Sequence, residues 1–442
     1  MAPPSPTLIK SSSILIIGAG TWGCSTALHL ARRGYNNVTV LDPYPVPSPI
    51  AAGNDVNKIV EHKELKAGIT SPQSLAFSVF SRAAMEGWKS DPVFSPYFHE
   101  TGFIIAADKL ELVKAIKEHE VDLHDADYVP LETAEDFRRS MPDGVLTGNF
   151  PGWKGWISRK DAGWVHSRNA IVSAYTEAKR LGVAFICGSP EGEMEGLVYE
   201  NGDVVGARTA DGNIHRAEHT ILAAGAASDR LLDFKNQLRP TAWTLSHIRM
   251  TAEETKKYRN LPVLFNVAKG FFIEPDEDAH ELKVCDEHPG YCNFLPDPDH
   301  PGEVRSVPFA KNQVPLESKA RTRAFLRDIM PHLADRPFSF GRICWDADTP
   351  DRAFLIDRHP EHKSLVVAVG GSGNGAMQVP SIGGFIADTL EGILTPEVKN
   401  VVRWRPETAV NRDWRDTQGR HGRPEKVMNF QDVSDDDWTQ IS

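Results

Sequence analysis

The feature that most constrains the fold is a glycine-rich turn near the start of the sequence. Gly18-Ala-Gly-Thr-Trp-Gly23 follows the apolar run Ile14–Ile17 and opens a segment with helical spacing, residues 21–33. A short run that is apolar throughout is typical of a parallel strand buried on both faces. Glycines permit a tight turn and the close approach of a pyrophosphate, whose charge meets the free N–H groups at the helix start. The pattern therefore predicts a dinucleotide-binding unit, with a purely structural glycine turn as the alternative.

An acidic residue stands where the second strand of such a unit should end. Residues 38–42 read Val-Thr-Val-Leu-Asp, and Asp42 comes 19 residues after Gly23. At that place a carboxylate can accept hydrogen bonds from both ribose hydroxyls of an adenosine. The adenosine half is common to FAD and NAD, so this unit alone does not separate the two cofactors.

A second glycine-rich turn, at residues 370–375, bears on that choice. It follows the apolar run Leu365–Val369 and precedes a helical pattern that continues to about Leu390. A helix start aimed at a flavin ring would stabilise the anion of the reduced ring. Residues 220–225, Thr-Ile-Leu-Ala-Ala-Gly, predict one more buried strand that ends at a glycine. Two distant turns favour one long FAD over NAD, although a plain loop before a surface helix also fits the second turn.

Composition excludes several classes of partner. The net charge is −11, which argues against nucleic acid or an anionic membrane as a partner. The five cysteines are odd in number and scattered, so we expect a reducing compartment and no disulfide framework. The sequence contains no run of roughly twenty apolar residues, so we expect no membrane span. A signal-peptide pattern and a peroxisomal tripeptide are also missing, so we expect a cytoplasmic protein.

The order of the predicted elements indicates two interleaved domains of an α/β fold. A helical pattern at 169–181 and a strand at 183–187 suggest a return to the first sheet, whereas residues 238–332 mix short strands with loops rich in Asp and Pro. We expect a Rossmann-type FAD domain interleaved with a substrate domain built on an antiparallel sheet. The predicted FAD domain covers residues 12–92, 155–237 and 335–442, and the predicted substrate domain covers residues 93–154 and 238–334.

One segment carries a specific resemblance. Residues 344–360, Cys-Trp-Asp-Ala-Asp-Thr-Pro-Asp-Arg-Ala-Phe-Leu-Ile-Asp-Arg-His-Pro, resemble the covalent-flavin segment of the monomeric sarcosine oxidase family. Further segments resemble the fungal fructosyl amino acid oxidases, or amadoriases, and the resemblance runs from about Ser12 to Asp432. These segments are residues 54–58, 238–243, 283–290 and 414–420. The resemblance implies an FAD-dependent amine oxidase that uses O₂ to oxidise the C1–N bond of fructosyl amino acids, giving glucosone, free amino acid and hydrogen peroxide.

The resemblance also implies roles for a cysteine and two lysines. In the family, the cysteine that matches Cys344 attacks the 8α-methyl carbon of the flavin. Arg342 would share a strand face with Cys344, where its positive charge would favour the thiolate. Lys283 matches the lysine that promotes the reaction of reduced FAD with O₂, because a nearby cation stabilises superoxide. Lys58 is a second cation beside the flavin. Without the match, Cys344 would be interpreted as a small buried hydrophobe and Lys283 as a surface charge.

Glu287 and Arg420 match the family pair that holds the substrate, and a peripheral salt bridge is the alternative for them. Trp243 is expected to line one wall of the substrate pocket, although an aromatic residue in an apolar strand is more often part of the core. We also expect Gly373 to contact the substrate. Four residues near this segment suggest zinc, but their spacing fits no zinc signature and we expect no metal. They are His280, Cys285, His288 and Cys292.

We expect FAD to contact residues from both glycine turns and from the segments between them. They are Gly18, Gly20, Thr21, Trp22, Gly23, Asp42, Asn57, Lys58, Cys344, Asp346, Gly371, Gly373, Gly375, Ala376 and Met377. The expected partners are a small fructosyl amino acid and O₂, and we expect a monomer. Three alternatives stay open, which are an N-methyl amino acid or pipecolate oxidase on the same scaffold, a non-catalytic or dehydrogenase flavoprotein, and an NAD-binding regulatory module.

Overall fold

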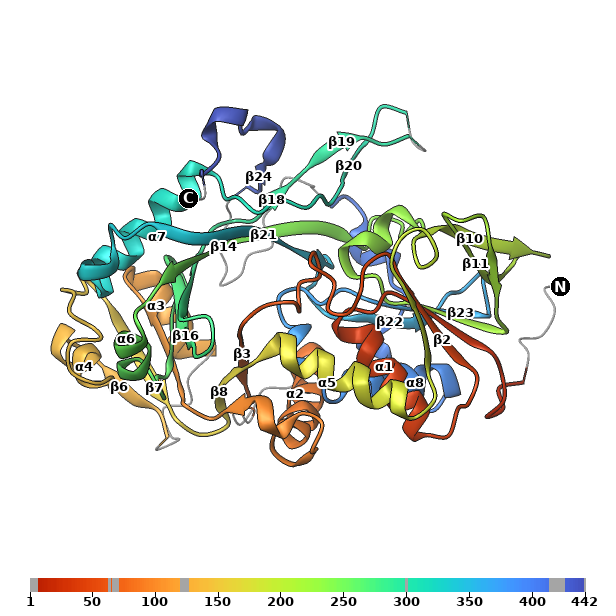
Figure 1. Cartoon of the computed structure of the whole chain (residues 1–442), viewed down its shortest axis with the longest axis horizontal. Helices are drawn as coiled ribbons and strands as arrows, with labels where there is room; N and C mark the ends of the chain where they lie inside the picture. The colour runs from red at the N-terminus through yellow and green to blue at the C-terminus, as the bar shows by residue number, and fades with distance from the viewer. Residues whose placement is uncertain are drawn as a thin grey trace.

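A computed structural model describes residues 7–62, 65, 71–119, 127–298, 301–412 and 426–440 (Figure 1). Within these ranges, six strands form what we call the first sheet, in the order β22-β23-β13-β1-β2-β9. Four of its five pairings are parallel, and β22 runs antiparallel to β23. The strands are β1 (Ile14–Ile17), β2 (Val38–Asp42), β9 (Ala184–Cys187), β13 (His219–Leu222), β22 (Leu355–Arg358) and β23 (Leu365–Val369).

The first sheet is buried on both faces because alternate side chains point to opposite sides of each strand. Ile14 and Ile16 belong to a core formed with helices, whereas Leu15 and Ile17 belong to a core formed with a β-meander. The covering elements are helices α1 (Thr21–Arg32), α2 (Pro72–Ser90), α5 (Ser167–Arg180), α8 (Ile382–Glu391) and α9 (Pro396–Val402), and meander strands β10 (Met194–Glu200), β11 (Asp203–Thr209) and β12 (Ile214–Arg216).

In the same described part of the chain, ten strands form a larger second sheet, in the order β24-β18-β14-β17-β16-β15-β5-β7-β6, with β21 paired to β14. In Figure 1 the paired strands β14 and β21 extend from the half that contains α7 towards the half that contains the first sheet. The strands are β5 (Phe103–Ala107), β6 (Val129–Leu131), β7 (Lys154–Ser158), β14 (Arg239–Arg249), β15 (Val263–Asn266), β16 (Gly270–Asp276), β17 (Glu281–Asp286), β18 (Tyr291–Cys292), β21 (Phe338–Asp348) and β24 (Met428–Asn429).

Helices cover the second sheet with apolar side chains. Phe325, Leu326 and Ile329 of α7 share a core with β14, β16 and β17, and Leu112 and Ile116 of α3 share another with β5 and β15. The helices of this half are α3 (Leu110–His119), α4 (Ala134–Arg139), α6 (Ala252–Lys257) and α7 (Leu316–Ile329). The remaining described strands form two small sheets. One contains β3 (Lys58–Glu61), β4 (Phe98–His99) and β8 (Ala162–Val165), and the other contains β19 (Phe294–Pro296) and β20 (Val304–Ser306).

The α/β fold with a mainly parallel sheet and a separate, largely antiparallel sheet agrees with the prediction. Three strands, β7, β21 and β24, pair within the second sheet. The predicted limits assigned almost all of their residues to the FAD domain. Helix α7 was also missed, since residues 238–332 were interpreted as strands and loops. The long pairing of β21 with β14 joins segments about a hundred residues apart, which local patterns do not reveal.

Candidate active site

One cavity of about 1230 Å³ runs between the two sheets, from the first glycine turn to the end of β17. Typical small-molecule sites measure roughly 300–1,000 Å³, so this cavity has room for a long cofactor together with a small substrate. Most of the predicted site residues line it. They are Gly18, Gly20, Thr21, Trp22, Asp42, Lys58, Trp243, Lys283, Glu287, Cys344, Asp346, Gly371, Gly373, Gly375, Ala376 and Met377.

At one end of the cavity the glycines of the first turn have two different roles. A Cβ on Gly23 would lie 1.8 Å from the carbonyl oxygen of Gly18, and a Cβ on Gly18 would lie 2.6 Å from that of Ala223. These two glycines are therefore needed for packing. A Cβ on Gly20 would meet nothing within 4 Å, so Gly20 faces open space. Among the described residues no side chain caps the start of α1, which leaves its N–H groups for an anion such as a pyrophosphate.

Asp42 lies at the same end, at the end of β2. Its carboxylate accepts hydrogen bonds from the N–H groups of Ala19 at 2.8 Å and Tyr44 at 2.9 Å. Burial raises the pKa of Asp42, although these two N–H groups act in the opposite direction. A carboxylate has more acceptor positions than these two bonds use, so ribose binding by Asp42 stays a prediction.

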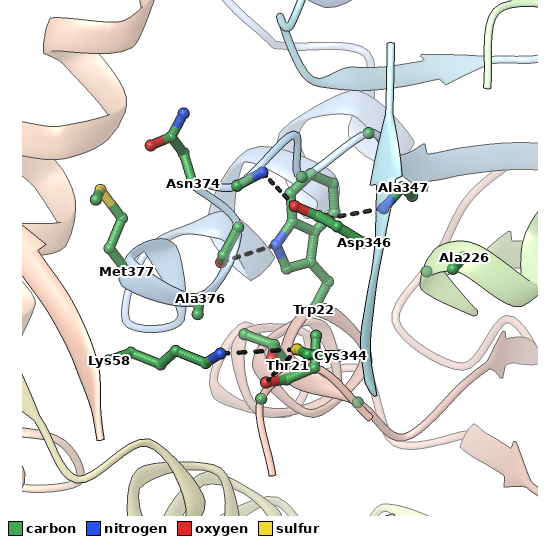
Figure 2. A pocket seen from close by; sticks show the side chains of 18 of the residues that line it. Thr21, Trp22, Lys58, Ala226, Cys344, Asp346, Ala347, Asn374, Ala376 and Met377 are labelled. Carbon is green, nitrogen blue, oxygen red and sulfur yellow. Dashed lines mark hydrogen bonds between the residues drawn. The ribbon is translucent and has the colours of Figure 1, made fainter. Parts of the chain in front are cut away.

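The second glycine turn is fixed to the first turn and to β21. The indole Nε1 of Trp22 donates to the carbonyl of Gly375 at 3.1 Å, and the carboxylate of Asp346 accepts from the N–H group of Gly373 (Figure 2). The expected long helix does not start at this turn. A single 3-10 turn, Ala376–Gln378, comes first, and α8 begins only at Ile382. Pro380 lies between them and has no N–H group to continue a helix.

Cys344 lies on β21 and lines the cavity, and it pairs with Trp243 on β14. Its sulfur is 3.9 Å from Nζ of Lys58, which reaches toward it in Figure 2. Arg342 shares the strand face with Cys344, as predicted, and its guanidinium donates to the carbonyls of Pro49 and Ala51. The arginine therefore also holds the proline-rich loop against β21.

Lys283 is 1% exposed, so its interpretation as a surface lysine is wrong. Its Nζ donates to Oδ2 of Asp55 at 2.6 Å and to the carbonyl of Asn57 at 2.8 Å. The same Oδ2 lies 2.9 Å from Nζ of Lys58. Burial alone would lower the pKa of Lys58, but Asp55 raises that pKa above its ordinary value.

Asp55 was not predicted as a site residue. Burial would raise its pKa, but the positive charges of Lys283, Lys58 and Arg342 hold the pKa of Asp55 well below its usual range. The sequence signal that could have indicated it is its position three residues before Lys58. Asn57 is not among the cavity-lining residues, and its side-chain amide donates to the carbonyl of Glu274 at 3.1 Å. Its expected contact with the cofactor stays a prediction.

A polar network lies behind Glu287, which is 7% exposed and follows β17. The preceding residue, Asp286, accepts from Thr244 at 2.7 Å and from Arg321 of α7 at 2.9 Å. Arg321 also donates to the hydroxyl of Tyr291 at 2.8 Å. Neither this network nor α7, which provides Arg321, was predicted from the sequence. The predicted partner of Glu287, Arg420, lies outside the described residues.

Within the part of the chain that the structure describes, no three His, Cys, Asp or Glu side chains are grouped to hold a metal ion. The four residues that suggested zinc have other contacts, such as His280 with the hydroxyl of Thr255 at 3.1 Å. No described helix is long and apolar enough to cross a membrane.

Comparisons with known proteins identify relatives of this chain. A model of the FAD dependent oxidoreductase family matches residues 13–389. Amadoriase I of Aspergillus fumigatus, a fructosyl amine:oxygen oxidoreductase, is 70% identical with a TM-score of 0.97, over 99% of each chain. Amadoriase II of the same fungus, a deglycating fructosamine oxidase solved in complex with FSA, is 52% identical with a TM-score of 0.94, over 99% of each chain. L-saccharopine oxidase of Schizosaccharomyces pombe is 30% identical over 90% of this chain and 94% of that protein.

Proposed function

The chain belongs to the FAD dependent oxidoreductase family, and we propose that it is an amine oxidase specific for fructosyl amino acids. The proposed reaction oxidises the bond between C1 of the fructosyl group and the amine nitrogen, consumes O₂ and yields glucosone, free amino acid and hydrogen peroxide. The observation that carries the proposal is the likeness to amadoriase I, a fructosyl amine:oxygen oxidoreductase, over nearly the whole of both chains.

FAD fits the cavity in this proposal with its ADP half at the first glycine turn. The open space beside Gly20 and the uncapped start of α1 suit a pyrophosphate. The ring half then lies near Lys58, Cys344 and the second glycine turn, all of which line the cavity. When bound, FAD supplies the acceptor for the hydride that leaves the substrate. In domain terms, the parts around the first sheet hold the ADP half of FAD, whereas the second sheet contributes Cys344 to the ring half and Lys283 to the substrate end.

Covalent attachment through Cys344 is part of the proposal. A cysteine attacks as its thiolate, and an ammonium group beside the sulfur can pair with the negative charge of that form. Lys58 provides that ammonium at 3.9 Å, and the sulfur is only partly buried within the cavity. The thiol is therefore accessible to a flavin ring and has a cation beside it.

Lys283 has the features needed for the reaction with O₂. It is buried, it lines the cavity, and Asp55 supports its positive charge at 2.6 Å. A cation in a partly dry site stabilises the negative charge that develops on oxygen. At the same end, the carboxylate of Glu287 can accept hydrogen bonds from the hydroxyl or amine groups of a sugar amine, and Arg420 is its proposed partner for the substrate carboxylate.

The test is peroxide production by the purified protein with single candidate substrates. Fructosyl-glycine, fructosyl-valine, ε-fructosyl-lysine, sarcosine and saccharopine are offered separately. Turnover of a fructosyl compound far above sarcosine and saccharopine is the expected result, and the order among the fructosyl compounds gives the substrate class. Turnover of sarcosine alone would instead assign an N-methyl amino acid oxidase, and turnover of saccharopine alone would assign a saccharopine oxidase. No peroxide with any of the five would contradict the proposed function.

A further inference from the structure

A chain of hydrogen bonds joins helix α7 to the substrate end of the cavity. Arg321 of α7 donates from Nε to Oδ2 of Asp286 at 2.9 Å, and its Nη2 donates to the hydroxyl of Tyr291 at 2.8 Å. The other carboxylate oxygen, Oδ1, accepts from the hydroxyl of Thr244 at 2.7 Å and from that of Ser318 at 3.0 Å. These three donors occupy most of the acceptor positions of the Asp286 carboxylate.

We infer that Arg321 is a positioning residue for the substrate, which pairs with Asp286 so that the neighbouring Glu287 is the carboxylate that receives the sugar amine. Arg321 itself is not among the described residues that line the cavity. The inference rests on the proposed function in assigning substrate binding to Glu287. It deepens that function by adding a residue of a covering helix that determines how tightly the fructosyl group is held.

The two adjacent carboxylates explain why this pairing is needed. Asp286 and Glu287 both line the cavity, and they are 2% and 7% exposed, so little water screens the repulsion between them. Arg321 compensates the charge of Asp286 and holds the end of β17 against α7. The N–H group of Glu287 donates to the carbonyl of Lys269 at 3.1 Å, which fixes the backbone at the next position. A sugar hydroxyl therefore meets one carboxylate whose neighbour is already paired.

A second route leads from Arg321 to the wall of the pocket. Tyr291, which accepts from Arg321, has its ring centroid 4.9 Å from that of His288 in an edge-to-face arrangement. The ring of His288 lies at 22° to that of Trp243, with centroids 6.2 Å apart, and Trp243 lines the cavity. A change at Arg321 should therefore affect Trp243 as well as Glu287.

The hydrogen bonds of His288 fix its ring. Nδ1 accepts from the N–H group of Gly290 at 2.9 Å, so the proton of the neutral ring is on Nε2. Nε2 lies 3.2 Å from the hydroxyl of Thr244, which in turn donates to Asp286 at 2.7 Å. The donors in this chain all point towards Asp286. Its negative charge, which Arg321 supports, therefore also orients the ring that packs near the pocket wall.

The experiment measures substrate binding separately from chemistry. Holoenzyme, unmodified or with Arg321→Met, is mixed anaerobically with fructosyl-glycine, fructosyl-valine or ε-fructosyl-lysine at increasing concentrations, and flavin reduction is followed by stopped flow. The concentration dependence gives the dissociation constant and the limiting rate. Arg321→Met should raise the dissociation constant about tenfold to hundredfold, the range for a lost hydrogen bond between charged groups, and should lower the limiting rate by less than about threefold.

Two outcomes would contradict different statements. Dissociation constants within about twofold of each other, in proteins that are both reduced, would overturn this inference alone. Failure of all three fructosyl compounds to reduce the unmodified protein would contradict the proposed function and the inference with it.

A matched control lies on the same helix. Arg327 forms an ion pair with Asp335 at 3.3 Å, and neither residue lines the cavity. Arg327→Met removes the same charge from α7 and should leave the dissociation constant unchanged. A rise equal to that in Arg321→Met would show an effect of net charge alone and would overturn the inference.

Arg321→Lys covers the case in which Arg321→Met does not fold. The side chain of Arg321 is 31% exposed, so neither substitution leaves a hole in the core. Arg321→Lys keeps the charge beside Asp286 but loses the planar fork that bonds Asp286 and Tyr291 together, so the dissociation constant should rise by only about threefold. A rise as large as that expected for Arg321→Met, or no rise at all, would overturn the positioning role.

Discussion

Backbone atoms form one end of the cavity, and buried charged side chains form the other. At the first turn, Gly18 and Gly23 are required because an added methyl group would collide with main-chain atoms. At the other end the contacts are made by side chains, such as Lys58 with Cys344 and Lys283 with Asp55, and the two lysines come from different sheets. The first end should therefore be sensitive to added volume, and the second should be sensitive to changes of charge at constant volume.

The largest effect is expected from Gly23→Ala. A Cβ at this position would lie 1.8 Å from the carbonyl oxygen of Gly18, so the turn must open at a cost of about 4 kcal/mol or more. We expect loss of bound flavin and a large fall in melting temperature, measured by absorbance and calorimetry. Gly20→Ala is the matched control for the fold alone, because its Cβ meets nothing within 4 Å, so the melting temperature of the flavin-free protein should stay unchanged. A yellow Gly23→Ala protein of unchanged stability would break the distinction between the two ends.

Lys283→Met should have the next largest effect, and it should change the reaction rate without changing the stability of the fold. The substitution removes a charge at similar volume, while Asp55 keeps Lys58 as a partner at 2.9 Å. We expect reoxidation by O₂ to slow by about 10²–10³-fold, in the range found when one charge-stabilising donor is lost. Anaerobic reduction by substrate should change far less, which stopped-flow absorbance can measure separately. Equal losses in both half-reactions would mean that Lys283 acts on substrate instead of O₂.

Cys344→Ala should show a smaller loss of activity and a qualitative change in flavin attachment. The first glycine turn is untouched, so FAD should still bind, but it should be released when the protein is precipitated with acid. Turnover should fall by less than in Lys283→Met, because the cation near O₂ is retained. Flavin that remains bound to the precipitated variant would show that a different residue forms the covalent link.

The smallest effect is expected from Glu274→Gln and concerns stability alone. Burial raises the pKa of Glu274 to about 7 from an ordinary value of 4.5, in contrast to Asp55, whose cations lower its pKa. The folded state therefore holds the Glu274 proton more tightly than the unfolded state does. The contribution of this proton to the free energy of unfolding is complete below about pH 4.5 and is lost as the pH rises through 7. Calorimetry from pH 5 to pH 8 should show the variant gaining stability relative to unmodified protein. Parallel curves would mean that Glu274 does not hold a proton in this range.

The backbone end could be predicted from the sequence because its determinants are local. The strand Ile14–Ile17, the glycine turn and the helix after it are adjacent in the chain, and each has its own local sequence pattern. The second glycine turn was located correctly, but Pro380 delays the following helix. The pattern at 370–390 did not reveal that interruption.

The charged end was harder to predict because its contacts join distant segments. Lys283 and Cys344 were identified through resemblance, whereas Asp55 was missed, since its partner Lys283 is 228 residues away. Helix α7 was missed although Phe325, Leu326 and Ile329 have helical spacing and Pro315 precedes its first turn. The support for Glu287 through Arg321 was therefore also missed. Side-chain networks of this kind depend on tertiary packing, which local propensities do not determine.

The pairing of β21 with β14 has a consequence for how the protein unfolds. Cys344 belongs through this pairing to the second sheet, whereas Gly18 follows β1 of the first sheet. A flavin bound at Gly18 and joined to Cys344 would connect the two sheets as a cross-link does, so that neither could separate from the other without disturbing it. The loaded protein should then melt in one cooperative transition, in which flavin absorbance and secondary structure change together, whereas the flavin-free chain should melt in two stages.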